Sequence, residues 1–431
     1  MAGEWMMSEL GDLTINFDGK RKPVKESDRR PGSYPYYGAS GVVDHVDGFI
    51  FDGDYLLIAE DGENLRTRQT PIAFMAKGRF WVNNHAHIVT GNDKADTRFL
   101  MYALQNADIS GYLTGAVMPK LTQGNLNRIE ISHPCVTEQR AIAHILGTLD
   151  DKIELNRRRN QTLEAMARAL FKDWFVDFGP VRAKGRGEPP CSPLSGQAQG
   201  PAPTTPYLPA DLWQLFPDRL DDEGKPEGWA MQPLSELLTI IGGGTPKTSV
   251  QEYWDGDIPW FSVVDTPSAS DVFVVSTEKT ITNQGLAESS ARLIPKGTTI
   301  ISARGTVGNL AIAGREMTFN QSCYGLRGTG NAGDYFVYLT AQHMVDQLKS
   351  MAHGSVFSTI TRQTFEAIQR PVPPSGVLGA FEGLVEGWFD AILSNVEESR
   401  TLAQLRDTML PKLISGELRM QDAELFIERA D

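Results

Sequence analysis

The chain contains few cysteines and no long hydrophobic segment. Three of its 431 residues are cysteine (Cys135, Cys191 and Cys323), and their wide spacing forms neither a disulfide framework nor a zinc-ligand pattern. No run of about 18 apolar residues occurs, which is the length that a transmembrane helix requires. Residues 1–10 lack the basic stretch and apolar core of a secretory signal. We therefore expect a protein of the reducing cytoplasm.

Positive charge is also scarce in this sequence. Lysine and arginine total 41 against 54 acidic residues, which gives a net charge of −13. Such a chain repels DNA at long range, so binding to DNA would need local basic clusters or partners that supply positive charge. Residues 20–30 form one basic cluster, although a solvated loop has the same composition.

A tandem duplication organises the chain, which is too long for one ordinary core. A shift of 239 positions aligns Gly115–Phe175 with Gly354–Ile414 without a gap. Asn156 falls on Asn395, and most apolar positions stay apolar. Upstream of this match the similarity between the two copies is weaker. It is limited to three pairs of segments: Ser33–Gly38 with Asp257–Ser262, Phe51–Ile58 with Ile294–Ile301, and Trp81–His87 with Thr318–Tyr324. The pattern predicts two domains of one fold with different ligands.

A long helix is expected in each copy. Thr137 is a plausible N-cap, Glu138 favours the positive end of the helix dipole, and Gly147 is the one glycine before about Phe175. Seam residues recur at spacings of three and four: Leu146, Leu149, Ile153, Asn156, Asn160, Leu163, Ala167, Leu170 and Trp174 in the first copy, and Val385, Trp388, Ile392, Asn395, Ser399, Leu402, Arg406, Met409 and Leu413 in the second.

Both seams carry polar residues at the same two positions, Asn156 with Asn160 and Asn395 with Ser399. A buried amide penalises wrong registers, so these residues are candidates for setting the register. We expect the two helices to pair as an antiparallel coiled coil with pseudo-twofold symmetry; the alternative is that each helix covers its own domain. Thirty helical residues span roughly 45 Å, which exceeds one DNA turn of about 34 Å. The pair could act as a ruler.

The expected fold class is α+β, with five segments. The predicted boundaries are 1–136 for the first globular domain, 137–179 for the first helix, 180–228 for a Pro/Gly-rich linker, 229–375 for the second globular domain, and 376–431 for the second helix and tail. The linker is expected to have little structure of its own. Leu212, Trp213, Leu215 and Phe216 are candidates for attaching part of it to a surface.

The chain resembles the DNA-specificity subunit of type I restriction–modification systems over essentially its whole length. The segments that carry this resemblance are Tyr34–Gly41, Phe51–Leu65, Trp81–His87, Glu138–Ala143, Ala169–Ala183 and Leu410–Leu418. One departure is that the second helix lacks the counterpart of Glu138-Gln139. Gly379, Gly383 and Gly387 also weaken its first turns, each by roughly 1 kcal/mol against alanine.

The resemblance implies two target-recognition domains, each reading one half of a split double-stranded DNA site. The helices would separate these domains and bind two methyltransferase subunits and, through them, the restriction subunits. S-adenosylmethionine, ATP and magnesium would be bound by the partner subunits, with no cofactor on this chain.

Enzyme chemistry has weak candidates here. Val372–Ser375 lacks the amide and aromatic of an adenine methyltransferase motif, and Pro246 removes a backbone donor from the phosphate-loop-like Gly242–Thr248. His85 and His87 alternate on a presumed strand without a third metal ligand. Asp52, Asp54, Glu60 and Asp61 could suggest a nuclease cluster, but no companion lysine follows, and a rim of acidic loop residues fits better. No catalytic or metal-binding residue is therefore predicted.

Base recognition needs donors and acceptors, chiefly Arg or Lys for guanine and Asn or Gln for adenine. The first-domain candidates are Tyr36, Tyr37, Arg66, Arg68, Asn83, Asn84 and His85, with Lys20, Arg21 and Lys22 on phosphates. The second-domain candidates are Lys247, Thr248, Trp260, Ser262, Arg304, Thr306, Gln321 and Tyr324. Trp260 and Tyr37 could equally be core residues, and Asn83 could cap a strand end.

We expect a non-catalytic reader of a bipartite, asymmetric DNA sequence that positions catalytic partner subunits. Two alternatives stay open at this point: a single-chain enzyme that acts on DNA unaided, and an adaptor that docks modification subunits without reading DNA.

Overall fold

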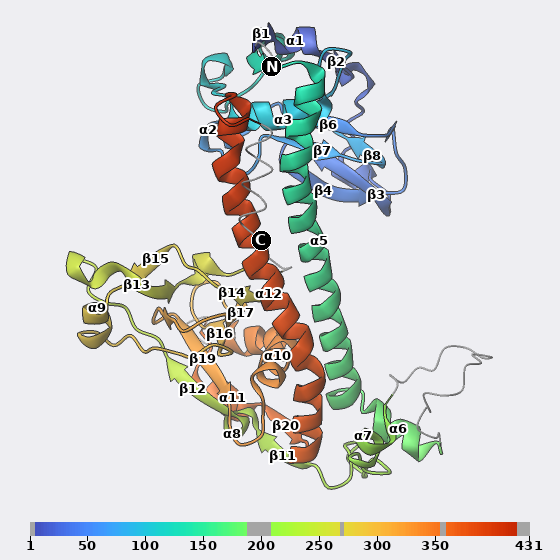
Figure 1. Cartoon of the computed structure of the whole chain (residues 1–431). Coiled ribbons are helices and arrows are strands. Elements are labelled where there is room, and N and C mark those ends of the chain that lie inside the picture. The colour runs from blue at the N-terminus through green and yellow to red at the C-terminus, as the bar shows by residue number, and fades with distance from the viewer. Residues whose placement is uncertain (1–4, 188–207, 268–270, 354–358, 420–431) are drawn as a thin grey trace. The chain divides into compact units, whose positions relative to one another are not determined.

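The computed structural model describes residues 5–187, 208–267, 271–353 and 359–419 (Figure 1). The chain divides into two compact units. One consists of Met1–Ile153 with Thr401–Asp431, and the other of Glu154–Arg400. Each unit therefore combines a globular domain with a segment of both long helices.

The first globular domain is a mixed α/β structure. Its strands are β1 (Met6–Glu9), β2 (Thr14–Asn16), β3 (Pro31–Gly38), β4 (Gly41–Val46), β5 (Phe51–Asp52), β6 (Tyr55–Ala59), β7 (Ala73–Ala76), β8 (Arg79–Val82), β9 (Ala86–Gly91) and β10 (Glu130–His133). Its helices are α1 (Leu10–Leu13), α2 (Asn64–Thr67), α3 (Thr97–Asn106) and α4 (Gln123–Asn127), with short 3-10 turns at Asp18–Lys20, Glu26–Asp28 and Ser110–Tyr112. The strands form sheets of order β2-β9-β6-β7 and β4-β3-β8-β5, and β1 pairs with β10.

The second globular domain is built from a similar set of elements. Its strands are β11 (Ala230–Pro233), β12 (Leu238–Gly242), β13 (Trp254–Phe261), β14 (Phe273–Val274), β15 (Lys279–Ile281), β16 (Thr299–Ser302), β17 (Leu310–Ala313), β18 (Thr318–Phe319), β19 (Cys323–Gly328) and β20 (Gln369–Val372). Its helices are α8 (Leu234–Leu237), α9 (Asn283–Ala287), α10 (Asp334–His353) and α11 (Arg362–Ala367), with 3-10 turns at Gln251–Tyr253 and Val263–Asp265.

The two domains share one topology. The order β2-β9-β6-β7 recurs as β12-β19-β16-β17, which β14 extends by one strand. Strand β3 pairs in parallel with β8, as β13 does with β18, and the pair β1-β10 recurs as β11-β20. The duplication predicted from the sequence is confirmed, and it reaches upstream of the ungapped match.

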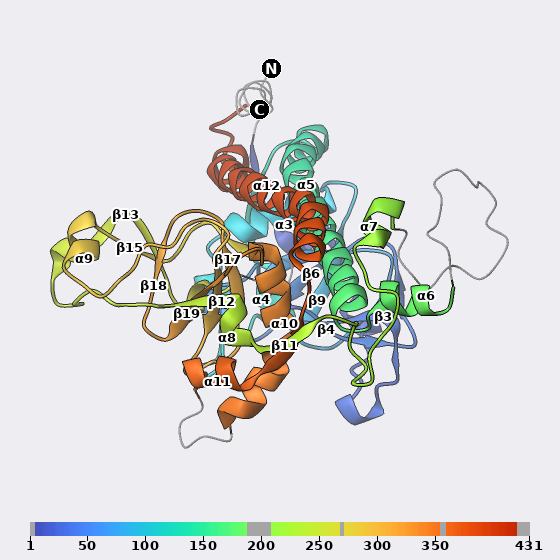
Figure 2. The same cartoon turned by 90° about the horizontal axis from the view of Figure 1, so that it is seen from below.

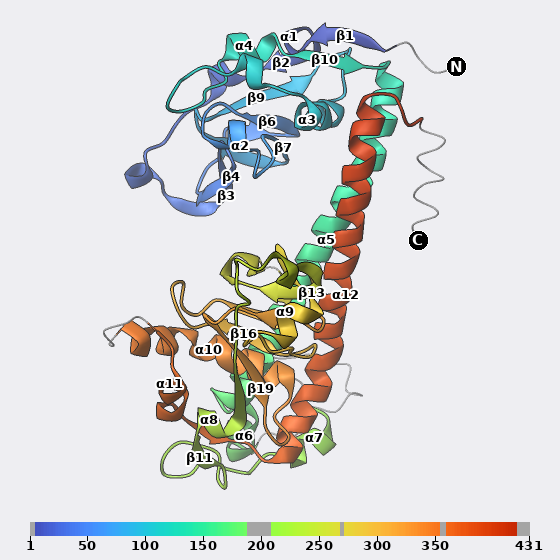
Figure 3. The ribbon, with the colours of Figure 1, turned by 90° about the vertical axis from the view of Figure 1, so that its left-hand side faces the viewer.

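Burial explains the central strands and the helices that cover them. Leu56, Leu57 and Ile58 of β6 are fully buried, so both faces of this strand are covered. The Asp96 side chain accepts hydrogen bonds from two backbone amides and caps α3. Helix α3 packs against β6, β7 and β9 (Figure 3), and α10 packs against β16, β17 and β19 (Figure 2). In each domain a helix thus covers the central strands of the sheet.

The long helices are α5 (Val136–Phe175) and α12 (Ser375–Ile414), which pair antiparallel (Figure 1). In the first unit Leu146 shares a core with Met409 and Leu413. In the second unit Trp174 shares a core with Val385. Every predicted seam residue is buried or half-buried, so the antiparallel coiled coil is confirmed. Helix α12 continues through Gly379, Gly383 and Gly387, because the apolar residues between them, such as Phe381, are fully buried.

The described parts of the predicted linker contain two short helices. Helix α6 (Gly179–Gly185) begins four residues after the last residue of α5, and α7 (Ala210–Gln214) forms before the second domain. Val181 is buried, and Phe216 lies edge-on to Trp174 at 4.9 Å between ring centroids. The contact of Phe216 bears out its expected attachment to a surface, whereas the burial of Val181 accounts for order at α6 that the Pro/Gly-rich composition did not predict. Residues 188–207 of the predicted linker lie outside the described residues.

Candidate nucleic-acid interface

The same turn joins two strands in both domains. After β8, Asn83 Oδ1 accepts from the His85 amide at 2.8 Å. After β18, Asn320 Oδ1 accepts from the Ser322 amide at 3.0 Å. The backbone N–H of each asparagine also donates to a carbonyl at the end of the neighbouring parallel strand. Asn83 N donates to Tyr37 O, and Asn320 N donates to Phe261 O. Asn83 thus has the capping role that was one of its two expected readings.

The central residue of each turn is an exposed amide: Asn84 in the first domain and Gln321 in the second. Neighbouring loops lie against both turns, since Glu60 N donates to His85 O and Ala303 N donates to Ser322 O. In the first domain the adjoining side chains are acidic and imidazole, with His85 Nδ1 at 2.8 Å from Asp61 Oδ2. The equivalent place in the second domain carries Arg304. One scaffold therefore presents an amide beside different chemical groups.

In the second domain, the turn after β18 and the loop beside it bring three candidates together: Arg304, Thr306 and Gln321. The Ser302 hydroxyl holds the hairpin between β16 and β17 by donating to Thr306 O and accepting from Asn309 N. Arg304 N and Ala303 N both donate to Ser322 O. These residues are exposed, as are Lys247 and Thr248 on the loop after β12. That loop reaches the same turn, because the Thr245 hydroxyl donates to Gln321 Oε1.

In the first domain, exposed side chains cover the turn and two nearby loops. His85 is 53% exposed, and Lys20 and Lys22 are exposed on the loop before β3. Arg66 is exposed on α2, although its Nη2 donates to Gly115 O at 2.9 Å. These residues, with Asn84, remain available to a ligand.

Tyr36 and Trp260 are corrected to core residues. Tyr36 is 1% exposed, and its hydroxyl accepts from Val24 N at 3.0 Å. Trp260 is 7% exposed, and its Nε1 donates to Gly244 O at 2.9 Å. They occupy equivalent strands, β3 and β13, so the shared aromatic signature belongs to the scaffold.

Three further aromatic or hydroxyl candidates also have internal contacts. Tyr37 packs against Phe74 and Phe80, and burial raises the pKa of its hydroxyl. The Tyr324 ring lies edge-on to Phe365. Ser262 caps the turn Val263–Asp265, with its hydroxyl 3.0 Å from Asp265 Oδ2. Packing and capping account for these side chains, and we do not retain them as base contacts.

Arg68 stabilises the end of a helix. Its backbone is left-handed, with φ of 50°, and its guanidinium donates to Gln105 O at 2.9 Å and Ala107 O at 2.6 Å. These carbonyls lie at the C-terminus of α3, where backbone acceptors lack helical partners. Burial lowers the pKa of this arginine. The expected base contact is corrected to a helix-capping role.

Arg21 belongs to an internal ionic cluster. It donates to Glu60 Oε2 at 2.7 Å and to Ala86 O at 2.8 Å. The buried His87 Nδ1 lies 2.6 Å from Asp18 Oδ2. Burial would raise the pKa of Asp18, but hydrogen bonds from His87 and the Ile88 amide outweigh it and lower that pKa. We therefore drop Arg21 as a phosphate contact. Sequence reasoning missed this cluster, because its members lie far apart along the chain.

Two of the other acidic candidates pair with different side chains of the first domain. Asp52 pairs with Arg79, whereas Asp61 pairs with His85. In the described part of the chain no three His, Cys, Asp or Glu side chains gather in a metal-binding arrangement. Within the same ranges, no helix has both the length and the apolar character needed to cross a membrane.

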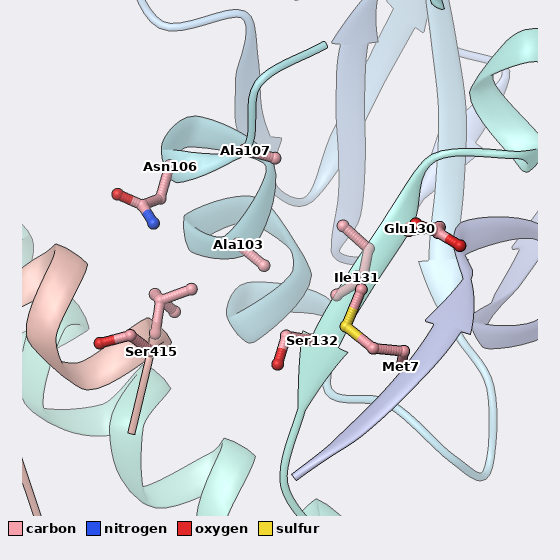
Figure 4. Close-up of a pocket in the computed structure, with 9 residues that line it drawn as sticks. Met7, Ala103, Asn106, Ala107, Glu130, Ile131, Ser132 and Ser415 are labelled. Carbon is pink, nitrogen blue, oxygen red and sulfur yellow. The ribbon is translucent and has the colours of Figure 1, made fainter. Parts of the chain in front are cut away.

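A pocket of about 370 Å³ lies in the first unit, at the ends of α3 and α12 beside β10 (Figure 4). Its polar side chains come from Asn106, Glu130, Ser132 and Ser415, and the remaining residues that line it are apolar. Glu130 is the one titratable group among them. An isolated carboxylate provides no acid–base pair, so this pocket does not suggest an active site.

The polar seam residues meet inside the second unit. Asn395 Nδ2 donates to Asn160 Oδ1 at 2.9 Å, and Asn156 Nδ2 donates to Ser399 Oγ at 3.3 Å and Glu398 Oε2 at 2.7 Å. Asn156 is 0% exposed and Asn160 is 1% exposed. Asn156 thus contacts Ser399, which is the repeat counterpart of Asn160, and Asn160 contacts Asn395, which is the repeat counterpart of Asn156. An antiparallel helix pair with a twofold axis between the two positions requires this exchange.

The family comparison agrees with the duplication. The model for the type I restriction modification DNA specificity domain matches this chain twice, at residues 2–165 and 226–377. The HindI specificity subunit of Haemophilus influenzae is 31% identical over 329 residues, covering 70% of this chain and 71% of that protein. The MjaIX specificity subunit of Methanocaldococcus jannaschii is 24% identical over 455 residues, covering 97% of this chain and 94% of that protein.

A solved structure has the same fold. The crystal structure of the type I restriction-modification S subunit from M. genitalium matches with a TM-score of 0.62 and 15% identity. The match covers 95% of this chain and 96% of that chain.

Proposed function

Because the chain belongs to the type I restriction–modification DNA specificity family, we propose that it reads a bipartite, asymmetric double-stranded DNA sequence. In this proposal the chain is not itself an enzyme. It positions two methyltransferase subunits and, through them, the restriction subunits. S-adenosylmethionine, ATP and magnesium are then bound by those partners.

The observation that carries the proposal is the repeated turn with its exposed amide. Asn84 and Gln321 occupy equivalent positions on one scaffold, and both are side-chain amides suited to adenine. The groups beside them differ, with His85 and Asp61 in the first domain and Arg304 in the second. A shared platform with different neighbours fits two half-sites of different sequence.

The remaining exposed candidates complete the two reading surfaces. Lys20 and Lys22 are proposed as phosphate contacts, and Arg66 and His85 as base contacts beside Asn84. Thr306 and Arg304 accompany Gln321, with Lys247 and Thr248 on the adjoining loop. Residues 1–136 and 229–375 are proposed as the two target-recognition domains, with 137–179 and 376–431 as spacer helices and 180–228 as the linker.

Methylome sequencing tests the reading role. A host would carry the modification subunit with the natural chain, with Asn84→Ala or with Gln321→Ala. Each variant should relax or abolish recognition at one half-site and leave the other unchanged. Loss of one adenine contact corresponds to about 1–3 kcal/mol of discrimination. An unchanged motif in both variants would contradict the proposed residues.

The adaptor alternative is tested by exchanging the globular domains. Swapping the two domains should reverse the order of the half-sites, whereas an adaptor that does not read DNA would leave the methylated sequence unchanged. Lengthening α5 and α12 by equal numbers of turns should lengthen the spacer and keep both half-sites. A changed half-site would contradict the role of the helices as a ruler.

A further inference from the structure

Helix α5 carries a second stripe of residues besides its buried seam. Leu155, Arg159, Thr162 and Met166 recur at spacings of four, three and four, which places them on one face of the helix. All four are exposed, and the two apolar residues at the ends of the stripe are each 44% exposed. This spacing suits a further helix lying along α5.

A groove of about 410 Å³ lies beside this stripe in the second unit. Leu163 of α5 and Ala391 of α12 form the apolar part of its lining, and the polar part comes from Arg158, Arg159, Thr162 and Asn395. Arg158 Nε donates to Glu154 at 2.8 Å, whereas Arg159 has no ion-pair partner among the described residues. The groove is therefore locally positive in a chain of net charge −13.

The repeat reverses these properties on α12. At an offset of 239 residues, Leu155 becomes Ser394, and Arg158 and Arg159 become Glu397 and Glu398. Ser394, Glu397 and Glu398 are exposed, and both glutamates also interact with other residues of the chain. Met166 becomes Leu405, which is half-buried. The counterpart stripe thus presents less apolar surface and the opposite charge.

We infer that two like partner subunits bind this chain at unequal positions, and that the first binds the Arg159 face through an acidic helical segment. The number and kind of partner rest on the proposed function. Identical subunits bring the same surface to both positions, so one surface cannot complement Arg159 and Glu398 equally well. An acidic segment with apolar residues matches the first face in both charge and exposed side chains.

Titration of the full chain with the modification subunit of its own system tests this inference. Native mass spectrometry and calorimetry would count the subunits bound and give the affinity of each step. We expect two steps that differ by at least about tenfold, the factor that corresponds to 1.4 kcal/mol. Raising the salt concentration should weaken the first step more than the second, because screening removes an attraction only at the first.

Variants with a reversed charge at one position test whether the two faces contribute to different binding steps. Arg159→Glu should weaken the first step about tenfold or more, while Lys279→Glu, an equal charge change at an exposed position of β15, should leave it unchanged. On the counterpart stripe of α12, the double variant Ser394→Leu with Glu397→Arg should strengthen the second binding step. The difference in affinity between the two steps should then become smaller. Glu398 is kept because it accepts a hydrogen bond from Asn156.

The outcomes distinguish this inference from the proposed function. Two equal steps, or equal effects of Arg159→Glu and Lys279→Glu, would overturn the inference and leave the proposed function standing. The absence of any complex with the modification subunit would overturn both. Circular dichroism of each variant excludes unfolding as the cause of a weakened step.

Discussion

Asn395 Nδ2 donates to Asn160 Oδ1 at 2.9 Å, although the repeat aligns Asn395 with Asn156. The contact between non-equivalent positions follows from the antiparallel direction of the helices. A shift of one turn would separate these amides and bring apolar seam residues against them. The pair is therefore placed to fix the register of α5 and α12.

The first prediction concerns this amide pair. Asn160→Leu leaves the Asn395 amide without its partner and should cost about 1–3 kcal/mol of unfolding free energy. The double variant Asn160→Leu with Asn395→Leu should recover that stability, because an apolar pair replaces a polar one. Urea unfolding of the natural chain, both variants and Gln161→Leu, an exposed control on α5, measures these differences. Equal destabilisation by the single and double variants would show that the residues are not coupled.

The second prediction separates two arginines on or beside α2. Arg68→Ala removes two hydrogen bonds at the C-terminus of α3 and should lower the unfolding free energy by about 1–3 kcal/mol. Arg66→Ala, at an exposed position, should change it by less than about 0.5 kcal/mol. Arg66→Ala should instead weaken recognition of one half-site. Thermal unfolding and the methylated motif check the two effects, and a reversed pattern would contradict both assignments.

The third prediction is a pH dependence of stability. Burial, with a smaller contribution from Asp177, raises the pKa of Asp173 from 3.8 to about 6. The folded state therefore binds a proton that the unfolded state releases between these values, so stability falls as the pH rises from about 4 to 6. Asp173→Asn should raise the melting temperature at pH 8 and have little effect at pH 4.

Asp18→Asn is the matched control for the pH experiment. The pKa of Asp18 is lowered by His87 and Ile88 despite burial, so its stabilisation is present above about pH 4 and is lost as the pH falls through the lowered value. This variant should lower the melting temperature at pH 8. The same direction of change for both variants would contradict the assigned environments.

The fourth prediction tests the turn that presents Gln321. A Cβ at Gly243 would lie 2.0 Å from Asn320 O, a backbone atom that cannot move without shifting the turn. Gly243→Ala should therefore destabilise the second domain and impair recognition of its half-site. Gly242→Ala meets nothing within 4 Å and should have little effect on either property. Equal recognition by both variants would contradict the role of the turn.

The sequence by itself determined the duplication, the two long helices and the seam. Those features depend on local spacing: apolar residues at three and four define a helix face, and a repeat at a fixed offset survives any change of surroundings. The family resemblance also lay in the sequence, in segments such as Phe51–Leu65. Even the charge reversal between Arg159 and Glu398 is readable from the aligned repeats.

Tertiary structure alone decided which candidates stay available to DNA. Arg66 and Arg68 have the same side chain two positions apart, yet one is exposed and the other caps α3. Tyr36 and Trp260 look like a binding signature because both follow a proline, but long-range packing buries them. Arg21 is paired with Glu60, 39 residues away. Burial and partner choice arise from contacts between distant segments, so no local pattern could distinguish these roles.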